Sequence, residues 1–400
     1  MTKPKVVFDP FSEEFFDNPF DMYRRMRQDA PLYYDEDEDY YALTRHADVA
    51  AAFKDFESFS SARGCDLAMV KSGDVPQKSI IFMDPPDHRN MRSLLNKAFT
   101  PRAIQNQRET VIEVIEKYLN AIDSDEFDLV QDFSGPFPVE VITRMAGVPD
   151  DYSQQVRHWI DASLEREPGN SGWTEAGMKA TIDSATYYYG LVQERRANPT
   201  TDMISRLVAA EIPGEDGQMR RLDDVEITGF VTLLGGAGAE TVTKLLGNAA
   251  VIFARNPDQW QKLQDDRSKI PAAVEELLRY EGPVQYNVRY TVKEVTLPSG
   301  TIPPGKPVFL CGAAANRDPE AFTDADTFDI DRDRAEAQNI GLGYGIHSCL
   351  GAALARMESA SALAHLLDFM PHYKVDFDGL RRVHMQNVAG YKNVPVKVLR

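Results

Sequence analysis

One long helical segment, residues 223–256, limits more than any other feature what this chain can fold into. It begins with Asp223 and has Glu226 three residues later, the spacing of a capping box at a helix N-terminus. Pro257 follows the segment and cannot continue a helix. A helix of about 30 residues is roughly 45 Å long, which is enough to cross a whole domain. We therefore expect residues 1–400 to form one large domain.

The pattern of the remaining chain predicts helices first and strands later. Within residues 18–209 the sequence favours helices joined by short loops, with 101–122 as one long helix and 40–45 as the only strand. Farther along, apolar and polar residues alternate between Pro and Gly turns, which predicts β structure over 283–312. The expected fold class is mainly α with a smaller β-rich part, near residues 31–45 and 283–312.

Composition excludes some classes of partner. Acidic residues outnumber basic ones by 62 to 44 and the net charge is -18, which argues against a nucleic-acid surface because phosphate contacts need clustered Lys and Arg. The N-terminus has no apolar signal core. The longest apolar run, 231–254, is interrupted by Glu240, Lys244 and Asn248. We therefore expect a cytoplasmic protein without a membrane span.

Three cysteines, Cys65, Cys311 and Cys349, form no CxxC pair and suit free cytosolic thiols. Cys349 lies in GYGIHSCLG, residues 343–351, where a glycine-rich loop meets a predicted helix N-terminus that favours a thiolate. Such a thiolate is a nucleophile or a metal ligand, but a buried structural cysteine fits the loop equally well. His347 raises the alternative of zinc, which usually needs three or four protein ligands.

The interior of the long helix contains residues that are unfavourable there. Gly235, Gly236 and Gly238 each cost about 1 kcal/mol relative to Ala, and an acid and an alcohol, Glu240 and Thr241, follow them. In one interpretation the glycines let a ligand approach and the pair passes protons into a closed pocket. In the other, the glycines allow close helix packing, Thr241 bonds the carbonyl one turn back, and Glu240 lies on a wet edge.

Two further pairs have helical spacing. His88 and Arg92 share one face and suit a carboxylate or phosphate ligand, although an exposed polar face is commoner for such a pair. Glu276 and Arg279 are spaced to form an ion pair opposite an apolar stripe. Periodicity therefore predicts that Glu276 and Arg279 face solvent and contribute little to stability.

In this order the segments resemble those of the cytochrome P-450 superfamily, the haem-thiolate monooxygenases, and specifically its soluble bacterial branch. GYGIHSCLG is similar to the family's haem-ligand loop, GAGAET to the oxygen-activating stretch of its long central helix, and EELLR to its helix-borne Glu-Arg pair. NRDPEAF and FDIDR also fall where the family has them. The resemblance covers nearly the whole chain and implies the cytochrome P-450 fold, with the long central helix over the haem.

The resemblance also implies a role for each matching residue. The cofactor would be haem b, with Cys349 of loop 342–351 as axial ligand of the iron. The family's donors to the haem propionates match His88, Arg92, Arg289 and His347. Its proton-delivering acid and alcohol match Glu240 and Thr241. Its buried structural core matches Glu276, Arg279 and Arg332, against the solvent-facing position that periodicity favours. The expected substrate pocket includes Leu234, Gly235, Ala237, Val284 and Val288.

One position departs from the family pattern. Seven residues before the cysteine the family usually has Phe, and here Leu342 would shield the thiolate with a smaller, non-aromatic side chain. This change affects the expected tuning of the iron potential rather than the ligation.

The implied function is insertion of one oxygen atom from O2 into a lipophilic substrate, by hydroxylation or epoxidation of a terpenoid, steroid or branched lipid. Further pocket residues are expected in 62–82 and 386–391 and in the helices that flank 169–177. Electrons are expected from a separate ferredoxin and its reductase. The electron donor is expected to dock on a basic patch drawn from Lys97, Arg102, Arg108 and Arg356. The alternatives are a peroxide-driven haem enzyme, against which Glu240 and Thr241 argue, and a non-enzymatic haem sensor or lipophile-binding protein.

Overall fold

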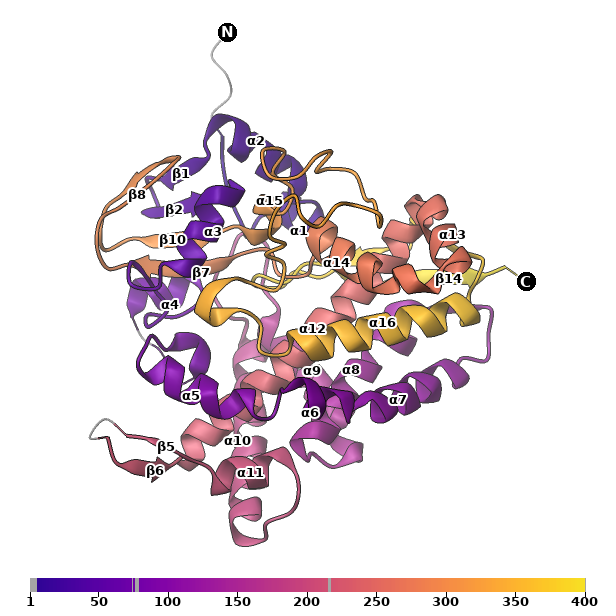
Figure 1. Cartoon of the computed structure of the whole chain (residues 1–400), viewed down its shortest axis with the longest axis horizontal. Coiled ribbons are helices and arrows are strands. Elements are labelled where there is room, and N and C mark those ends of the chain that lie inside the picture. The colour runs from indigo at the N-terminus through magenta and orange to yellow at the C-terminus, as the bar shows by residue number, and fades with distance from the viewer. Residues whose placement is uncertain (1–5, 74, 76–78, 215–216, 400) are drawn as a thin grey trace.

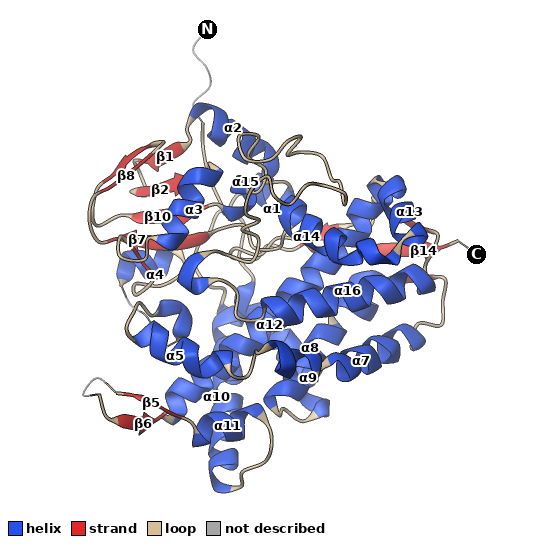
Figure 2. Ribbon diagram, in the orientation of Figure 1, coloured by secondary structure: helices blue, strands red, loops and turns tan. Residues whose placement is uncertain are grey.

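The computed structural model describes residues 6–73, 75, 79–214 and 217–399. Helices make up most of it, and the strands gather on one side (Figure 2). The structure therefore confirms the predicted fold class, mainly α with a smaller β-rich part.

The element bounds are as follows. The α-helices are α1 (Glu13–Asp17), α2 (Phe20–Asp29), α3 (His46–Lys54), α4 (Leu67–Ser72), α5 (Asp87–Asn96), α6 (Pro101–Gln105), α7 (Arg108–Asn120), α8 (Pro136–Ala146), α9 (Ser153–Leu164), α10 (Glu175–Ala197), α11 (Met203–Ala209), α12 (Asp224–Arg255), α13 (Pro257–Asp265), α14 (Ile270–Glu281), α15 (Gly312–Ala315) and α16 (Ala352–Phe369). Short 3-10 turns are η1 (Ile80–Phe82), η3 (Asp150–Tyr152), η4 (Arg267–Lys269) and η5 (Gly345–His347), and η2 (Leu129–Ser134) is a π-helical turn.

The predicted long helix is α12, with 32 residues, and it crosses the molecule (Figure 1). Its capping box is present: the side chain of Asp223 accepts from the backbone N–H of Glu226, and the Glu226 side chain accepts from that of Asp223. Pro257 begins the next helix, α13, as expected of a residue that lacks an N–H. The largest cluster of buried apolar side chains surrounds α12, which packs against α8, α9, α10 and α16.

The main sheet has five strands in the order β1 (Leu32–Asp35), β2 (Tyr40–Leu43), β10 (Pro307–Leu310), β7 (Asn287–Thr291) and β3 (Phe59–Ser60). Only the β10–β2 pairing is parallel. Smaller sheets join β11 (Tyr373–Val375), β14 (Pro395–Val398) and β4 (Glu126–Asp128); β12 (Arg381–Arg382) and β13 (Tyr391–Asn393); β5 (Glu211–Pro213) and β6 (Met219–Arg221); and β8 (Val295–Leu297) and β9 (Gly300–Ile302).

Two expectations for the first half of the chain are wrong. Residues 40–45 are not its only strand, because β1, β3 and β4 also lie there. These strands have two to four residues, too few to show an alternating pattern, and they exist through partners elsewhere in the chain. The helix expected over 101–122 is interrupted between α6 and α7 at Asn106 and Gln107. That the whole chain forms one domain stays a prediction.

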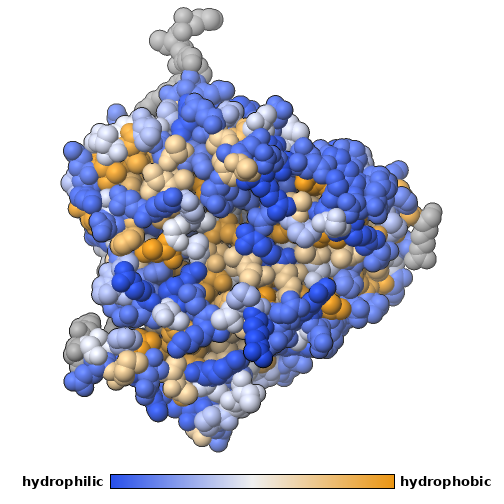
Figure 3. All heavy atoms as spheres, in the orientation of Figure 1, coloured by the Kyte–Doolittle hydropathy of each residue, from blue (hydrophilic) through white to orange (hydrophobic). Residues whose placement is uncertain are grey.

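Hydrophilic side chains cover most of the face shown in Figure 3, in keeping with the charge of the sequence. In the described part of the chain, no helix combines the length and the apolar character that crossing a bilayer requires.

Candidate functional site

The loop that contains Cys349 joins η5 to α16 and lies against α3. The backbone N–H of Cys349 donates to the carbonyl oxygen of Leu342 over 2.8 Å, which closes the loop on itself. Gly345 has a φ of 73°, in the left-handed region that favours glycine. A Cβ added there would collide with the carbonyl oxygen of Phe53 at the end of α3. Only glycine therefore allows this close approach.

Cys349 differs from the other cysteines in its surroundings. Cys311 is buried and Cys65 partly so, whereas Cys349 has exposed surface although protein surrounds it. Burial raises the pKa of Cys349, and the backbone N–H of Gly351 and the charge of Arg92 oppose that rise. That the helix N-terminus favours a thiolate at Cys349 stays a prediction. A bound metal ion would displace the proton.

Four basic side chains from three separate segments lie near this loop. The rings of His88, on α5, and His347, in η5, lie 4.3 Å apart between centroids. The Nε2 atoms of both are buried and have no hydrogen-bond partner among the described residues. Arg92, one turn after His88, donates through Nη2 to the carbonyl oxygen of Ser348 over 2.7 Å.

Arg289, on β7, is the fourth basic side chain and is 7% exposed. Its Nη1 donates to the carbonyl oxygen of Val288 over 2.9 Å. Burial lowers the pKa of Arg289, and burial together with the charges of Arg289 and His88 lowers the pKa of His347 to about 3. No described carboxylate forms an ion pair with Arg92 or Arg289. Arg92 and Arg289 thus carry positive charge that lacks a matching anion among the described residues, whereas the lowered pKa of His347 leaves that ring neutral.

Glu240 and Thr241 are adjacent on α12 but differ in their surroundings. Glu240 is 2% exposed, and its Oε1 lies 2.6 Å from Nζ of Lys244, one turn farther along the helix. Thr241 is half-buried and donates its hydroxyl to the carbonyl oxygen of Ala237 over 3.1 Å. The interpretation that places Glu240 on a wet edge is therefore wrong, whereas Thr241 does bond the carbonyl one turn back.

Gly235, Gly236 and Gly238 of α12 have two different roles. A Cβ on Gly235 would lie 2.9 Å from the hydroxyl of Tyr188, and one on Gly238 would lie 3.0 Å from Cγ1 of Ile142. These two glycines therefore allow α10 and α8 to pack closely against α12. A Cβ on Gly236 would meet nothing within 4 Å, so this position faces open space.

The described residues contain no zinc site, because no three of their His, Cys, Asp or Glu side chains are grouped so that they could hold a metal ion. A metal ion on Cys349 would need most of its other ligands from a cofactor.

Comparison with known proteins decides the family. The family model for cytochrome P450 matches residues 171–389, more than half of the chain. This chain belongs to the cytochrome P450 family. It is accordingly an oxidoreductase, a monooxygenase whose cofactor is an iron-containing haem.

Relatives and solved structures match this P450 over nearly its whole length. It is 39% identical to putative cytochrome P450 123 of Mycobacterium tuberculosis over 398 residues, 99% of this chain and 98% of that protein. It is 34% identical to erythromycin C-12 hydroxylase of Saccharopolyspora erythraea over 93% of this chain and 92% of that one. The crystal structure of CYP109E1 from Bacillus megaterium in complex with testosterone matches with a TM-score of 0.86 and 32% identity, over 97% and 99% of the two chains.

The residues around Cys349 fit a haem. A haem carries two propionate carboxylates, and the positive charge of Arg92 and Arg289 lacks an anion of that kind. The two orphaned Nε2 atoms are free to bond carboxylate oxygens. These donors would suit the propionates, and the thiol of Cys349 would suit the iron at the centre of the ring.

Glu276 and Arg279 form a buried network in this P450. Nε and Nη2 of Arg279 donate to the two carboxylate oxygens of Glu276 over 2.8 and 2.7 Å, and Nε of Arg332 donates to Oε1 over 3.2 Å. The side chains of Glu276 and Arg279 are 4% and 2% exposed, so the solvent-facing position predicted by periodicity is wrong. Arg279 also donates to the carbonyl oxygens of Asn316 and Ala325, which explains why a polar pair is buried here.

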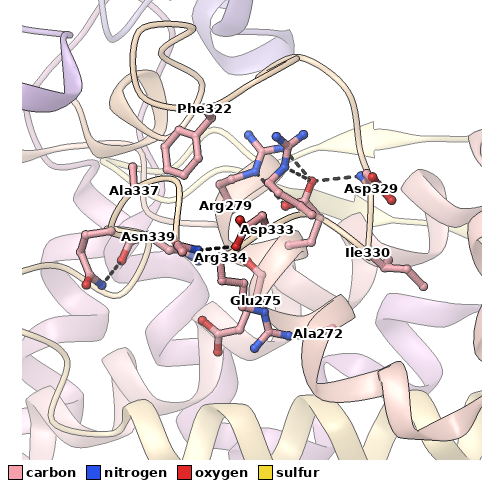
Figure 4. Close-up of a pocket in the computed structure, with 14 residues that line it drawn as sticks. Ala272, Glu275, Arg279, Phe322, Asp329, Ile330, Asp333, Arg334, Ala337 and Asn339 are labelled. Carbon is pink, nitrogen blue, oxygen red and sulfur yellow. Dashed lines mark hydrogen bonds and ion pairs between the residues drawn. The ribbon is translucent and has the colours of Figure 1, made fainter.

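A cavity of about 410 Å³ adjoins this network (Figure 4). Charged side chains line much of it, among them Glu275, Asp333 and Arg334, and Cys349 is not part of its lining. It is therefore not a site for a lipophilic substrate beside the thiol.

The five residues expected in the substrate pocket lie in different surroundings. Ala237 is exposed and Val284 is half-buried, so both can face a ligand. Gly235 faces Tyr188, and Leu234 is 8% exposed within the apolar core. Val288 is 0% exposed and packs in a cluster with Phe309 of β10, and its place in the pocket stays a prediction. Of the expected loop 62–82, residues 74 and 76–78 lie outside the described residues.

Sequence reasoning did not name Leu233, which is half-buried on α12, whereas Gly236 is among the glycines expected to let a ligand approach. Leu233 precedes Ala237 and Thr241 at steps of four, so all three share one face of the helix. That spacing could have identified Leu233. Sequence reasoning also did not identify Lys244 as the partner of Glu240, although Lys244 lies one helical turn after it.

Proposed function

We propose that this P450 binds haem b and inserts one oxygen atom from O2 into a lipophilic substrate, using electrons from a ferredoxin and its reductase. The observation that carries the proposal is the cluster of His88, Arg92, Arg289 and His347 around the Cys349 loop, in which the two arginines lack an anion and the two histidines have unpaired Nε2 atoms. The sequence contains no CxxCH motif for covalent attachment, which supports haem b over c-type haem.

Cys349 would be the axial ligand, and the haem it holds would supply oxygen activation, with the thiolate favouring O–O cleavage. The four basic side chains would fix the cofactor by charge-assisted hydrogen bonds to its propionates. Glu276, Arg279 and Arg332 would hold the segments on the thiolate side in place without touching substrate.

Thr241 and Glu240 would handle the protons that the reaction consumes. The hydroxyl of Thr241 lies on the face of α12 that Ala237 exposes, where it would hold a water molecule. Glu240, one residue earlier and buried, would exchange protons with that water. A general acid or base of this kind typically contributes about 100-fold or more to a rate.

A lipophilic substrate is supported by the side chains that remain accessible on α12 and beside β7, since Leu233, Ala237 and Val284 are apolar. Two similar structures contain testosterone and corticosterone, and a third contains erythromycin B. We therefore propose a steroid, terpenoid or branched lipid, to be found by screening for ligands that displace the iron-bound water and then by product analysis.

Thr241→Ala tests the proton role. We expect NAD(P)H oxidation to continue while the yield of product per electron falls by about tenfold or more. The reason is that the variant lacks the hydroxyl that would hold the proton-donating water. The measurement is product formed per NAD(P)H oxidised. Thr243→Ala is the matched control, because Thr243 makes the same hydrogen bond, to the carbonyl oxygen of Ala239 over 3.1 Å, but is buried. An unchanged yield in Thr241→Ala would remove Thr241 from the mechanism.

A basic patch on α5 to α7 supports an acidic electron donor. Lys97, Arg102 and Arg108 are exposed, and none pairs with a carboxylate of a described residue. Figure 1 shows α6 and α7 beside α16, which follows the Cys349 loop. Arg356, the fourth expected member, instead pairs with Glu275 over 2.5 Å. Its charge is largely neutralised, so we propose that the other three carry the attraction.

Charge reversal tests this patch. In the triple variant Lys97→Glu, Arg102→Glu, Arg108→Glu, we expect reduction by ferredoxin to slow by about tenfold at low salt and to lose most of its salt dependence. Stopped-flow reduction at several ionic strengths is the measurement. Arg206→Glu is the control, because Arg206 is exposed on α11, away from α16 (Figure 1). Equal rates and salt slopes in the triple variant and the native protein would place the docking site elsewhere.

A further inference from the structure

Glu358, on α16, is a buried acid that the proposed function does not use. It is 1% exposed, both oxygens of its carboxyl group are buried, and neither oxygen has a hydrogen-bond partner among the described residues. An ionised carboxylate that is buried without a partner is strongly unfavourable. The fold must therefore either supply a cation to this group or keep a proton on it.

The fold supplies a cation to every other buried glutamate in the described part of the chain. In each of these five cases a Lys or Arg nitrogen lies 3.0 Å or less from a carboxylate oxygen. The pairs are Glu140–Arg144, Glu226–Arg220, Glu240–Lys244, Glu276–Arg279 and Glu281–Arg382. No described cation forms such a pair with Glu358, so a proton is the remaining way to remove its charge.

Glu358 lies on the side of α16 that packs against α7. His365 marks this side, because its Nε2 lies 3.9 Å from Oε1 of Glu116 on α7. Glu358 is seven residues, or about two helical turns, before His365 and therefore lies on the same side of the helix. α7 runs beside α16 (Figure 1). The buried residues of α7 are all apolar: Val111, Val114, Ile115 and Leu119.

The other helices around α16 offer Glu358 no free charge either. α16 packs against α6, α7, α12 and α14. Among their described residues, α6 and α7 have no buried charged side chain, and those of α12 and α14 belong to the pairs just named. Partly exposed charges at the edge of these contacts also pair elsewhere, as Glu116 does with His365 and Glu275 with Arg356. Burial alone therefore raises the pKa of Glu358, well above its usual range.

We infer that Glu358 is a buried proton site: its carboxyl group holds one proton in the folded protein and releases it only when α16 and α7 separate. The protonated group has no charge to bury, whereas the ionised group would need water or a cation that this interface lacks. The inference goes beyond the proposed function, because it concerns the fold and not the reaction. α16 begins three residues after Cys349, so the site acts on the helix that follows the ligand loop.

The proton site makes stability depend on pH in one direction. In the unfolded chain a glutamate ionises near pH 4.5, whereas burial keeps the proton to a higher pH in the folded protein. Between these two limits unfolding releases one proton, so the equilibrium constant for unfolding should increase about tenfold for each pH unit. The contribution of the site to stability is thus fully present below pH 4.5 and is lost as the pH rises.

Infrared spectroscopy of the haem-loaded protein tests the protonation state directly. At about pH 8, well above the usual range of a glutamate, we expect the native protein to show the C=O band of a protonated carboxyl group that Glu358→Gln lacks. Glu140→Gln is the matched control, because Glu140 is also 1% exposed but accepts from Nζ of Lys117 over 2.7 Å. Burial acts to raise the pKa of Glu140, but the bonds from Lys117 and Tyr118 outweigh it and keep that pKa below its usual range.

Glu140→Gln should accordingly leave the band of the protonated carboxyl group unchanged. If the native protein and Glu358→Gln have the same spectrum in this region, Glu358 is ionised and the inference is overturned.

Chemical unfolding at several pH values is the second readout. The unfolding constant of the native protein, divided by that of Glu358→Gln, should increase by about 100-fold from about pH 6 to about pH 8. Urea denaturation followed by far-UV circular dichroism is the measurement. A fixed cost of the buried amide changes this ratio equally at every pH, so the slope still reports the proton. A ratio that does not change with pH would also overturn the inference.

Should Glu358→Gln fail to fold, Glu358→Met replaces the carboxyl group by an apolar side chain and should give the same slope. Neither measurement depends on product formation. Failure of the proposed function would therefore leave the test of Glu358 intact, and failure of the proton site would leave the proposed function standing.

Discussion

Replacing Cys349 by serine is expected to abolish the long-wavelength band of the reduced carbon monoxide complex and to reduce product formation to background. A serine hydroxyl is a far weaker ligand for the iron than a thiolate, and it would not favour O–O cleavage. The backbone bond from residue 349 to Leu342 does not involve the side chain, so the loop itself should persist. The absorption spectrum of the purified variant, reduced under carbon monoxide, is the measurement.

Cys311→Ser is the control for this change, because Cys311 is a free thiol buried in an apolar cluster that does not contain Cys349. It should keep the native spectrum. A Cys349→Ser protein that retains the long-wavelength band would contradict the assignment of Cys349 as the ligand.

The second large effect is expected on stability. Arg279→Met should lower the free energy of unfolding by about 3 to 5 kcal/mol, because it leaves the buried carboxylate of Glu276 without its main partner. The carbonyl oxygens of Asn316, Ala325 and Thr327 would lose their donors at the same time. Chemical denaturation followed by far-UV circular dichroism, together with the haem content of the purified protein, measures the effect.

Arg25→Met provides the comparison, since Arg25 pairs with Glu14 over 2.7 Å while both side chains are more than half exposed. Exposed ion pairs usually contribute less than about 1 kcal/mol. Equal losses in Arg25→Met and Arg279→Met would mean that the Glu276 network does not act as a buried unit.

The long helix and the ligand loop could be predicted because their signals are local. The capping box of Asp223 and Glu226 and the stop at Pro257 lie within the helix or next to it. The short strands could not be predicted in the same way, because β3 has two residues and depends on its pairing with β7. Their signal is the partner strand, which lies far away in the sequence.

The same distinction holds for the candidate site. Periodicity misplaced Arg279 because it uses only the spacing within one helix. The carbonyl groups that stabilise Arg279 when it is buried belong to residues 316–327, outside that helix. Lys244 was within reach of sequence analysis, since its spacing from Glu240 is that of a helical ion pair.

The most direct test of the central claim is the absorption spectrum of the native protein, loaded with haem, reduced and saturated with carbon monoxide. We predict the strongly red-shifted band of a thiolate-ligated haem, with full intensity. A spectrum without that shift, as a haem ligated by histidine gives, would contradict Cys349 as the ligand and the function proposed from it.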